Sequence, residues 1–366
     1  MPDPAAAFDA LLRLAVEAGA SDIHLRAGRP ALLRVRGDLV PAEMPPLESA
    51  AIGAFVAATL PEVFRPAWER DHQADYALDR GELGRYRVNA YRQRGTPGVV
   101  LRLVKTRPPS LADLSLDPSL ARLAELGSGI VLVCGPTGSG KSSTLAALLR
   151  HLNETADLHV VTLEDPVEYL FEDRRCAFSQ REIGLDVPDF GSGLRAALRQ
   201  DPDVILIGEM RDRATFETAL QAAETGHLVL STLHAGSTQQ AVQRLFEFFP
   251  PEEAAAARRA IASSLRAVVI QALLPRADGA GVIPATEVLV VDPLARRVLG
   301  EGQFEKIGDV VEAGKDAGSR TLNADLHRLV RSGAVAKSVA LERSPAPRAL
   351  EMLLAGIQTA TGRIVQ

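Results

Sequence analysis

The N-terminal third of the chain alternates short apolar segments with polar turns. Apolar residues between Phe8 and Val16 recur at helical spacing, which predicts a helix over residues 5–18. Further along, alternation of apolar and polar positions predicts short strands, with a second helix between them. The expected strands are 21–25, 31–37, 85–93 and 98–105, and the expected helix is 48–60. Together these elements predict a small α+β domain over residues 1–104.

The pattern changes after a proline-containing segment. Residues 105–112 are predicted to form a linker, because Pro108 and Pro109 cannot continue a helix or a central strand. Short apolar strands that end in polar residues then alternate with helices. The expected strands are 129–135, 159–165, 203–209 and 227–235, and the first expected helix is 141–152. Strands that are apolar throughout are buried on both faces, so this pattern predicts an α/β core with a parallel sheet over residues 113–275.

The last quarter of the chain reads differently again. From about residue 251 it is rich in Ala, Leu and Arg, and we expect a mostly helical C-terminal region over residues 276–366. No apolar run approaches the roughly 20 residues needed to cross a bilayer. The N-terminus lacks the basic region of a signal peptide, so we expect a cytoplasmic protein.

Composition narrows the possible functions. Of the 366 residues, 46% are hydrophobic and 24% are charged, as in soluble globular proteins. The formal net charge of −5 argues against a general nucleic-acid-binding surface. The chain has only two cysteines, Cys134 and Cys176, so it cannot hold a four-cysteine zinc site.

A phosphate-binding loop follows the strand at 129–135 and opens the helix at 141–152. Its glycines allow positive φ and close approach of the backbone to phosphate oxygens, and the helix start adds partial positive charge. Lys141 is expected to reach the β- and γ-phosphates of ATP, and the Ser142 hydroxyl is expected to ligate Mg²⁺. The candidate nucleotide-binding residues are Gly135, Pro136, Thr137, Gly138, Ser139, Gly140, Lys141, Ser142 and Ser143. This motif between a strand and a helix predicts a P-loop nucleotide-binding protein.

Polar residues also stand at the ends of the other core strands. Glu164, Glu209 and His234 each end a predicted strand. Ligands gather at the carboxyl ends of the strands in parallel sheets. One carboxylate is expected to orient or deprotonate water, and another to hold magnesium through its water shell. His227 stands at the start of its strand, where a structural hydrogen bond and a ligand role are both open.

With these motifs in place, the chain resembles the secretion-type hexameric ATPases, most closely the retraction ATPases of type IV pili. The similarity rests on four motifs that occur together and in the same order. They are the Walker A motif GPTGSGKSS (135–143), the aspartate box TLEDPVEY (162–169), the Walker B region LRQDPDVILIGEMRD (198–212) and the histidine box TGHLVLSTLHAGST (225–238). Residues 20–39 also resemble the N-terminal domain of the family, and residues 264–276 and 319–335 resemble its C-terminal helical part.

The resemblance implies a RecA-like P-loop ATPase core with a PAS-like N-terminal domain, assembled as a homo-hexamer. ATP would bind between one core and the N-terminal domain of the neighbouring subunit, whose Arg87 and Arg102 complete the site. Glu164 would activate water, and Glu209 would be the Walker B carboxylate that acts on Mg²⁺ through water. By the same resemblance, His234 would sense the γ-phosphate or couple it to domain motion.

The biological role implied by the family is hydrolysis of ATP coupled to mechanical retraction of type IV pili, which drives twitching motility and DNA uptake. The implied partners are a pilus platform protein in the inner membrane and a paralogous retraction ATPase. The chain would therefore work in the cytoplasm, peripherally associated with the inner membrane. No direct contact with nucleic acid is expected.

Three alternatives stay open. Pilus-assembly and type II secretion ATPases share the chemistry, although the pilus-assembly relatives usually carry a longer N-terminal region and a four-cysteine zinc module. A RecA-like ring that translocates DNA is a second alternative, and a ring member that binds ATP without turnover is a third. A C-terminal motif of the retraction group is matched only in part, at residues 294–298. This leaves open whether the protein is a principal or an accessory retraction motor. The tail after Ser344 matches little that we recognise.

Overall fold

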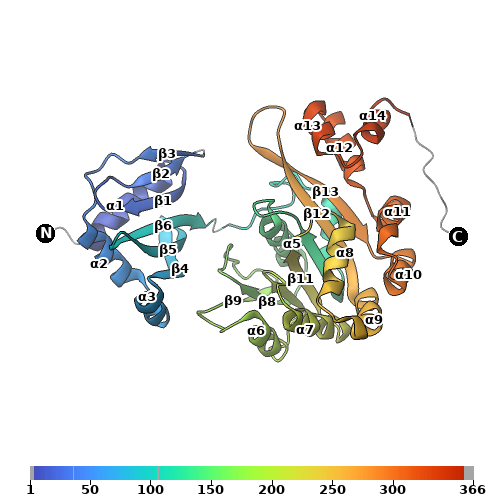
Figure 1. Cartoon of the computed structure of the whole chain (residues 1–366), viewed down its shortest axis with the longest axis horizontal. Helices are drawn as coiled ribbons and strands as arrows, with labels where there is room; N and C mark the ends of the chain where they lie inside the picture. Colours follow the sequence, from blue (N-terminus) through green and yellow to red (C-terminus); the bar gives the residue numbers. More distant parts are fainter. Residues whose placement is uncertain (1–3, 36, 105–106, 358–366) are drawn as a thin grey trace. The chain divides into compact units, whose positions relative to one another are not determined.

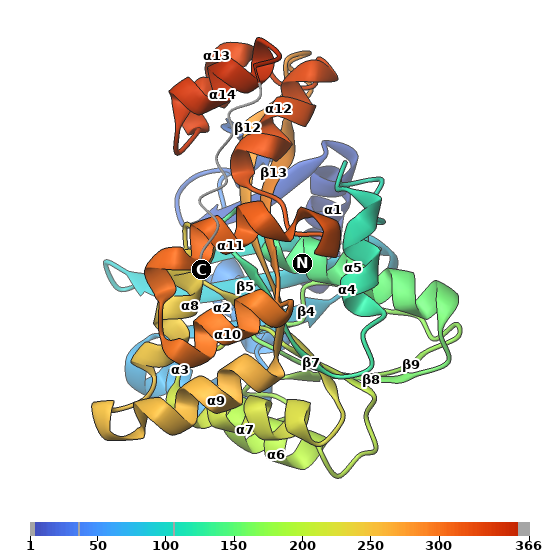
Figure 2. The same cartoon turned by 90° about the vertical axis from the view of Figure 1, so that its right-hand side faces the viewer.

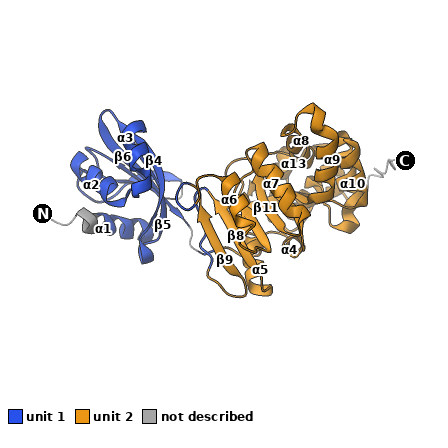
Figure 3. Cartoon of the chain, turned by 90° about the horizontal axis from the view of Figure 1, so that it is seen from below, with its two compact units in different colours: residues 1–107, 165–171, 184–186 blue, residues 108–164, 172–183, 187–366 orange. Residues whose placement is uncertain are grey.

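The computed structural model describes residues 4–35, 37–104 and 107–357 (Figure 1). Contacts divide the chain into two compact units, which Figure 3 colours separately. The N-terminal unit holds residues 1–107 with the short segments 165–171 and 184–186, and the C-terminal unit holds residues 108–164, 172–183 and 187–366. Residues 105 and 106, the first two of the predicted linker, lie outside the described residues.

A six-stranded antiparallel sheet of order β3-β2-β1-β6-β5-β4 forms the centre of the N-terminal unit. Its strands are β1 (Ala20–Arg26), β2 (Leu32–Val35), β3 (Asp38–Pro41), β4 (Gln73–Asp79), β5 (Arg85–Gln93) and β6 (Thr96–Val104). Its helices are α1 (Pro4–Glu17), η1 (Glu62–Phe64), η2 (Gly81–Leu83), α2 (Ser49–Thr59) and α3 (Arg65–Asp71). Alternation along β5 buries Tyr86, Val88 and Ala90 in the apolar core with α1 and α2, and it leaves Arg87 exposed.

A seven-stranded sheet of order β13-β12-β7-β11-β10-β8-β9 forms the centre of the C-terminal unit. Its strands are β7 (Gly129–Cys134), β8 (His159–Glu164), β9 (Ala177–Glu182), β10 (Val204–Ile207), β11 (Leu228–Leu233), β12 (Leu265–Pro275) and β13 (Val282–Val290). All neighbouring pairs are parallel except β12 and β13. Every residue of β7, β10 and β11 is buried, as expected for continuous apolar strands covered on both faces.

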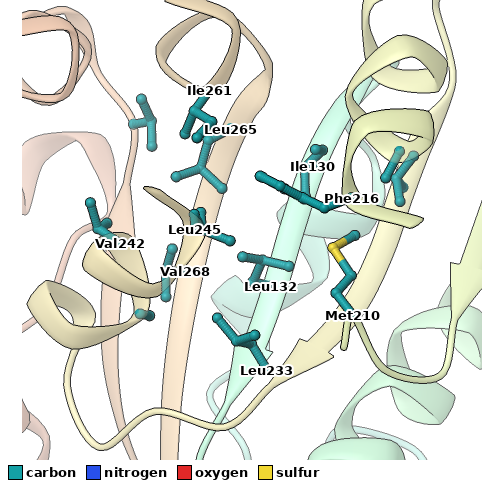
Figure 4. Close-up of a cluster of buried hydrophobic side chains, with 14 of the residues drawn as sticks. Ile130, Leu132, Met210, Phe216, Leu233, Val242, Leu245, Ile261, Leu265 and Val268 are labelled. Carbon is teal, nitrogen blue, oxygen red and sulfur yellow. The ribbon is translucent and has the colours of Figure 1, made fainter. Parts of the chain in front are cut away.

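Helices cover both faces of this sheet (Figure 2). They are η3 (Pro118–Leu120), α4 (Ala121–Ala124), α5 (Lys141–Thr155), α6 (Phe190–Ala197), α7 (Arg213–Glu224), α8 (Thr238–Glu247), η4 (Pro251–Glu253) and α9 (Ala254–Ser264). Figure 4 shows the core under α7, α8 and α9, where Ile130 and Leu132 of β7 meet Phe216, Leu245 and Ile261. Burying such side chains contributes about 1.5–3 kcal/mol each, so this packing holds the strand that carries the phosphate loop.

The C-terminal region departs from the sequence expectation at its start. Residues 264–276 were expected to be helical, and this was wrong: β12 pairs in parallel with β7, and β13 returns antiparallel to it. A continuous apolar run carries no period that separates strand from helix, and the free edge of β7 decides in favour of the strand. The boundary expected at residues 275 and 276 falls between these two strands.

Short helices follow the two strands. They are α10 (Pro293–Glu301), η5 (Phe304–Lys306), α11 (Ile307–Ala313), η6 (Gly314–Ala317), α12 (Leu322–Arg331), α13 (Lys337–Arg343) and α14 (Pro347–Leu354). Side chains of α12, α13 and α14 pack with the ends of β12 and β13 in a separate small core. Across the described residues, the helices are too short or too polar to cross a bilayer.

Candidate nucleotide site

The phosphate loop connects the end of β7 to the start of α5. Gly135 and Gly140 have φ of +156° and +86°, values that side-chain-bearing residues rarely adopt. A Cβ atom on Gly135 would lie 2.4 Å from the backbone oxygen of Gln271, so this position also has no room for a side chain. Gly140 is the N-cap of α5, and the free N–H groups of the first turn lie directly after it.

Lys141 and Ser139 line the loop. Lys141 is only 9% exposed, and its Nζ donates to the carbonyl oxygens of Gly135 and Pro136, both at 3.0 Å. The Ser139 hydroxyl is buried and has no hydrogen-bond partner in the part of the chain that the structure describes. Ser142 and Ser143 are half-buried at the start of α5. A buried ammonium, an unsatisfied hydroxyl and a helix N-terminus together form a cradle suited to an anion.

Glu209 and His234 lie together at the carboxyl ends of β10 and β11. The Nε2 of His234 is 3.4 Å from Oε1 of Glu209, and Arg211 pairs with Oε2 at 2.8 Å. The backbone before Glu209 is fixed, because Thr232 Oγ1 donates to the carbonyl oxygen of Gly208 at 2.7 Å. Since β11 separates β10 from β7, His234 stands on the strand between the phosphate loop and Glu209.

Glu164 ends β8 and is held differently. Its side chain is buried and accepts hydrogen bonds from Thr162 Oγ1 at 2.7 Å and from Gln180 Nε2 at 3.3 Å. With neighbouring strands about 4.8 Å apart, β8 lies about 14 Å from β7, and β10 lies about 10 Å from it. Glu209 therefore leaves the sheet closer to the phosphate loop than Glu164 does.

A pocket of about 410 Å³ opens beside Glu209. Its lining residues are Glu209, Met210, Arg211, Leu233, His234, Arg244, Glu247 and Phe248. Arg244 reaches from α8 and donates to the backbone oxygen of His234, which fixes the chain where β11 ends. A pocket of this volume, with carboxylate, guanidinium and imidazole groups in its wall, has the size and polarity of a small-molecule site.

His227 lies at the amino-terminal ends of the parallel strands, opposite the end that carries the phosphate loop. It precedes β11, and its backbone oxygen accepts the N–H of Gly129 at the start of β7. Its Nδ1 is 2.9 Å from the carbonyl oxygen of Ala222 and 3.2 Å from the hydroxyl of Thr225, both at the end of α7. The structure thus places His227 apart from the phosphate loop in the same chain, in a setting typical of a structural hydrogen bond.

Arg87 and Arg102 belong to the N-terminal unit, where they are directly opposite each other on β5 and β6. Arg102 is 68% exposed and donates to the buried carboxylate of Asp22 at 2.8 Å. Burial acts to raise the pKa of Asp22, but hydrogen bonds from Arg102 and Ser21 outweigh it and lower that pKa. Asp22 is thus a carboxylate partner that keeps the Arg102 side chain on the exposed face of the sheet.

Comparison with known proteins identifies the family. Residues 5–281 match the family model described as type II/IV secretion system protein. The chain is 38% identical to the type IV pilus retractation ATPase PilT of Pseudomonas aeruginosa, over 92% of this chain and 98% of that one. It is 36% identical to the type IV pilus ATPase PilU of the same organism, over 95% and 91% of the two chains. A crystal structure of the pilus retraction motor PilT with bound ADP superimposes with a TM-score of 0.87 at 36% identity, covering 94% and 98% of the two chains.

The chain belongs to the type II/IV secretion family. It is an ATPase of that family, and the match in structure confirms the predicted RecA-like core with an N-terminal α+β domain. The nucleotide in the PilT crystal structure agrees with a nucleotide-binding role for this fold.

Magnesium is the metal ion that a phosphate loop of this kind implies. Among the described residues, no group of three or more His, Cys, Asp or Glu side chains is arranged to hold a metal ion. Mg²⁺ in nucleotide enzymes keeps several waters and takes only one or two protein ligands beside the phosphates. The hydroxyl of Ser142 and the carboxylate of Glu209 are hard oxygen donors of that kind.

Sequence reasoning missed residues that support these groups. Gln271 and Thr144 hydrogen-bond each other next to the loop, and Gln180 holds Glu164. Arg211 and Arg244 lie inside or just after the recognised motifs, but nothing in their spacing marks them as partners of Glu209 and His234. A lone Gln within an apolar run, as at position 271, was the one available signal, because an amide in a buried strand requires polar partners.

Proposed function

We propose that this ATPase drives retraction of type IV pili as a homo-hexamer. The observation that carries the proposal is the similarity to PilT along nearly the whole length of both chains, in sequence and in structure. A second relative named as a pilus ATPase, PilU, is matched over a comparable length. We infer that the present chain works with an inner-membrane platform protein, from the cytoplasmic side, and alongside a paralogous ATPase.

The phosphate loop is the binding half of the proposed mechanism. Lys141 exchanges its carbonyl partners at Gly135 and Pro136 for phosphate oxygens, and the N–H groups at the start of α5 complete the cradle. Ser142, together with Glu209 through water, would hold Mg²⁺. When bound, Mg²⁺ would neutralise charge on the β- and γ-phosphate oxygens.

The strand ends are the hydrolytic half. Glu164 aligns and deprotonates the attacking water, and His234, in contact with Glu209, responds to the presence of the γ-phosphate. Arg87 and Arg102 enter from the N-terminal unit of the neighbouring subunit, where guanidinium groups stabilise the charge that develops on the transferring phosphoryl group. Loss of the γ-phosphate contacts then releases the neighbouring unit, and differential affinity for the two arrangements converts binding into motion.

Deleting the gene tests the direction of the motor. We expect cells that lack the protein to carry excess surface pili and to lose twitching motility. Re-expression of the wild-type chain should restore both properties. Re-expression of Lys141→Ala should restore neither, because the purified variant loses at least about a hundredfold in ATP turnover without its phosphate-binding ammonium.

The alternatives give different results in the same strain. Cells without pili would identify an assembly ATPase, and unchanged pili with blocked protein export would identify a secretion ATPase. Full restoration by Lys141→Ala would show that ATP turnover is not what the machine requires.

A further inference from the structure

A glutamine of β12 contacts the phosphate loop from outside the recognised motifs. Its neighbour Ile270 pairs with Cys134, the last residue of β7, so Gln271 lies level with Gly135, where the loop begins. Gln271 is only 3% exposed. A buried amide is costly unless both of its polar ends are hydrogen-bonded, so the oxygen and the nitrogen of the Gln271 side chain each require a partner.

Both ends of the Gln271 side chain are hydrogen-bonded. Nε2 donates to the carbonyl oxygen of Ser139 at 2.7 Å, and Oε1 accepts the hydroxyl of Thr144 at 2.7 Å. A carbonyl oxygen only accepts, so the amide nitrogen must face Ser139 and the amide oxygen must face Thr144. Thr144 lies in the first turn of α5 and is 1% exposed, so one side chain ties together the strand, the loop and the helix.

The hydrogen bond to Ser139 sets the direction of a phosphate-binding donor. A trans peptide is planar, and its C=O and N–H point in opposite directions. Because the Ser139 carbonyl points at Gln271, the N–H of Gly140 in the same peptide points away from β12. In that orientation it is available to a phosphate oxygen, as the N–H groups at helix N-termini commonly are.

Gln271 also approaches the loop too closely for side chains at two of its positions. A Cβ atom on Gly135 would lie 2.4 Å from the backbone oxygen of Gln271, and one on Gly140 would lie 2.9 Å from its Nε2. The first and the last glycine of the loop thus both pack against this one residue. The path of the loop therefore depends on its packing against Gln271 as well as on the conformation of its own backbone.

We propose that Gln271 is a positioning residue for ATP. It holds the Ser139–Gly140 peptide in the orientation that presents the loop donors to the phosphates, and Thr144 holds Gln271 in turn. The proposal rests on nucleotide binding at this loop and is independent of pilus retraction and its direction.

The test compares three variants of the full chain: Gln271→Met, Thr144→Val and the matched control Thr144→Ser. Affinities for ATP and for inorganic tripolyphosphate are measured by calorimetry with Mg²⁺, and thermal unfolding is followed in parallel. Tripolyphosphate lacks the nucleoside, so it reports on the loop alone. We expect Gln271→Met to weaken the binding of both ligands by the same factor, about tenfold or more. The reason is that the N–H of Gly140, a donor to a charged phosphate oxygen, is then misdirected. Thr144→Val should weaken both about threefold, and Thr144→Ser should stay near the wild type.

A residue that only stabilised the core would give another result. The Tm of folded Gln271→Met would fall while its tripolyphosphate affinity stayed at the wild-type value, and that result would overturn the proposal. If Gln271→Met does not fold, the threonine pair decides: equal affinities of Thr144→Val and Thr144→Ser overturn the proposal, and a loss that serine restores supports it. Because these affinities are measured on purified protein, they stand whatever the pilus phenotype turns out to be.

Discussion

Lys141 and Glu164, at the carboxyl ends of the parallel strands, are held far more tightly than Arg87 and Arg102 on the N-terminal sheet. Lys141 is 9% exposed and Glu164 is 8% exposed, and each is hydrogen-bonded within its own unit. The side chain of Arg102 on β6 is 68% exposed, and its carboxylate partner is Asp22. Arg87 beside it is exposed as well.

This difference indicates a division of labour. Groups that bind phosphate gain from being placed in advance, because little entropy is then lost when the ligand arrives. Arginines that stabilise only the charge developing on the transferring phosphoryl group must be able to exchange one partner for another. The exposed Arg102 side chain can make this exchange, and its cost is the loss of one partner of the buried Asp22 carboxylate, which keeps its hydrogen bond from Ser21. We therefore regard the loop as the fixed half of the site and the arginine pair as its conditional half.

Replacing the two carboxylates separately gives the largest expected effect. We expect Glu164→Gln to lower kcat by about a hundredfold or more while ATP affinity changes little, because a general base is lost and phosphate contacts are kept. Glu209→Gln should also lower kcat, and it alone should raise the Mg²⁺ concentration needed for half-maximal activity. Steady-state ATPase assays over a range of Mg²⁺ concentrations distinguish the two variants.

The order of the strands supplies the competing outcome. Because β10 is nearer to β7 than β8 is, the competing hypothesis is that Glu209 serves both metal and water and that Glu164 is a buried structural acid. In that case Glu164→Gln would keep most of its kcat. Glu224→Gln, at the end of α7, is a control in the same unit and should match the wild type.

The fold was largely predictable because the core strands are short, continuously apolar and bounded by polar residues. The strands expected at 129–135 and 159–165 are β7 and β8, each within one residue at either end. The failure at 264–276 has a physical reason. Its Ala and Leu residues favour a helix, and only the pairing with β7, which is a long-range contact, makes it a strand.

The site was less predictable than the fold. The motif of the phosphate loop is local, so its residues could be named from spacing alone. The partners of the site residues lie outside the local motifs. Gln271 is separated from Ser139 of the loop by 132 residues, and Gln180 is separated from Glu164 at the end of β8 by 16. His227 shows a second limit of motif reasoning: it shares a motif with His234, but the structure places it at the amino-terminal end of β11, away from the phosphate loop of its own chain.

Removing Arg102 tests the conditional half of the site. We expect Arg102→Ala to lower kcat of the assembled enzyme by about tenfold to a hundredfold and to leave the KM for ATP nearly unchanged, because the arginine acts on transition-state charge. Asp22→Asn weakens the hold on Arg102 and should lower kcat far less. Arg26→Ala, an exposed arginine on β1 of the same unit, is the matched control. Equal kcat for all three variants and the wild type would remove Arg102 from the site.

The smallest expected effect concerns a segment near the start of the C-terminal unit. Asp117, the N-cap of η3, accepts hydrogen bonds from Ser119 and from Arg320, which also donates to Thr286 on β13 at 2.8 Å. Burial acts to raise the pKa of Asp117, but these hydrogen bonds outweigh it and lower the pKa to about 2. A pKa lowered by folding stabilises the protein above the unfolded-state value of about 4, and that contribution is lost as the pH falls toward 2.

Asp117→Asn should therefore lower the free energy of unfolding by about 1 kcal/mol at pH 7, a modest figure because solvent screens a carboxylate that is 23% exposed. The difference from the wild type should shrink between about pH 4 and pH 2, where the native carboxylate becomes protonated. Denaturant unfolding at several pH values measures both effects. Asp278→Asn, which removes an exposed carboxylate paired with Arg276, is the control and should change little. A constant difference from the wild type at every pH would mean that charge-independent contacts of Asp117, and not its charge, stabilise the start of this unit.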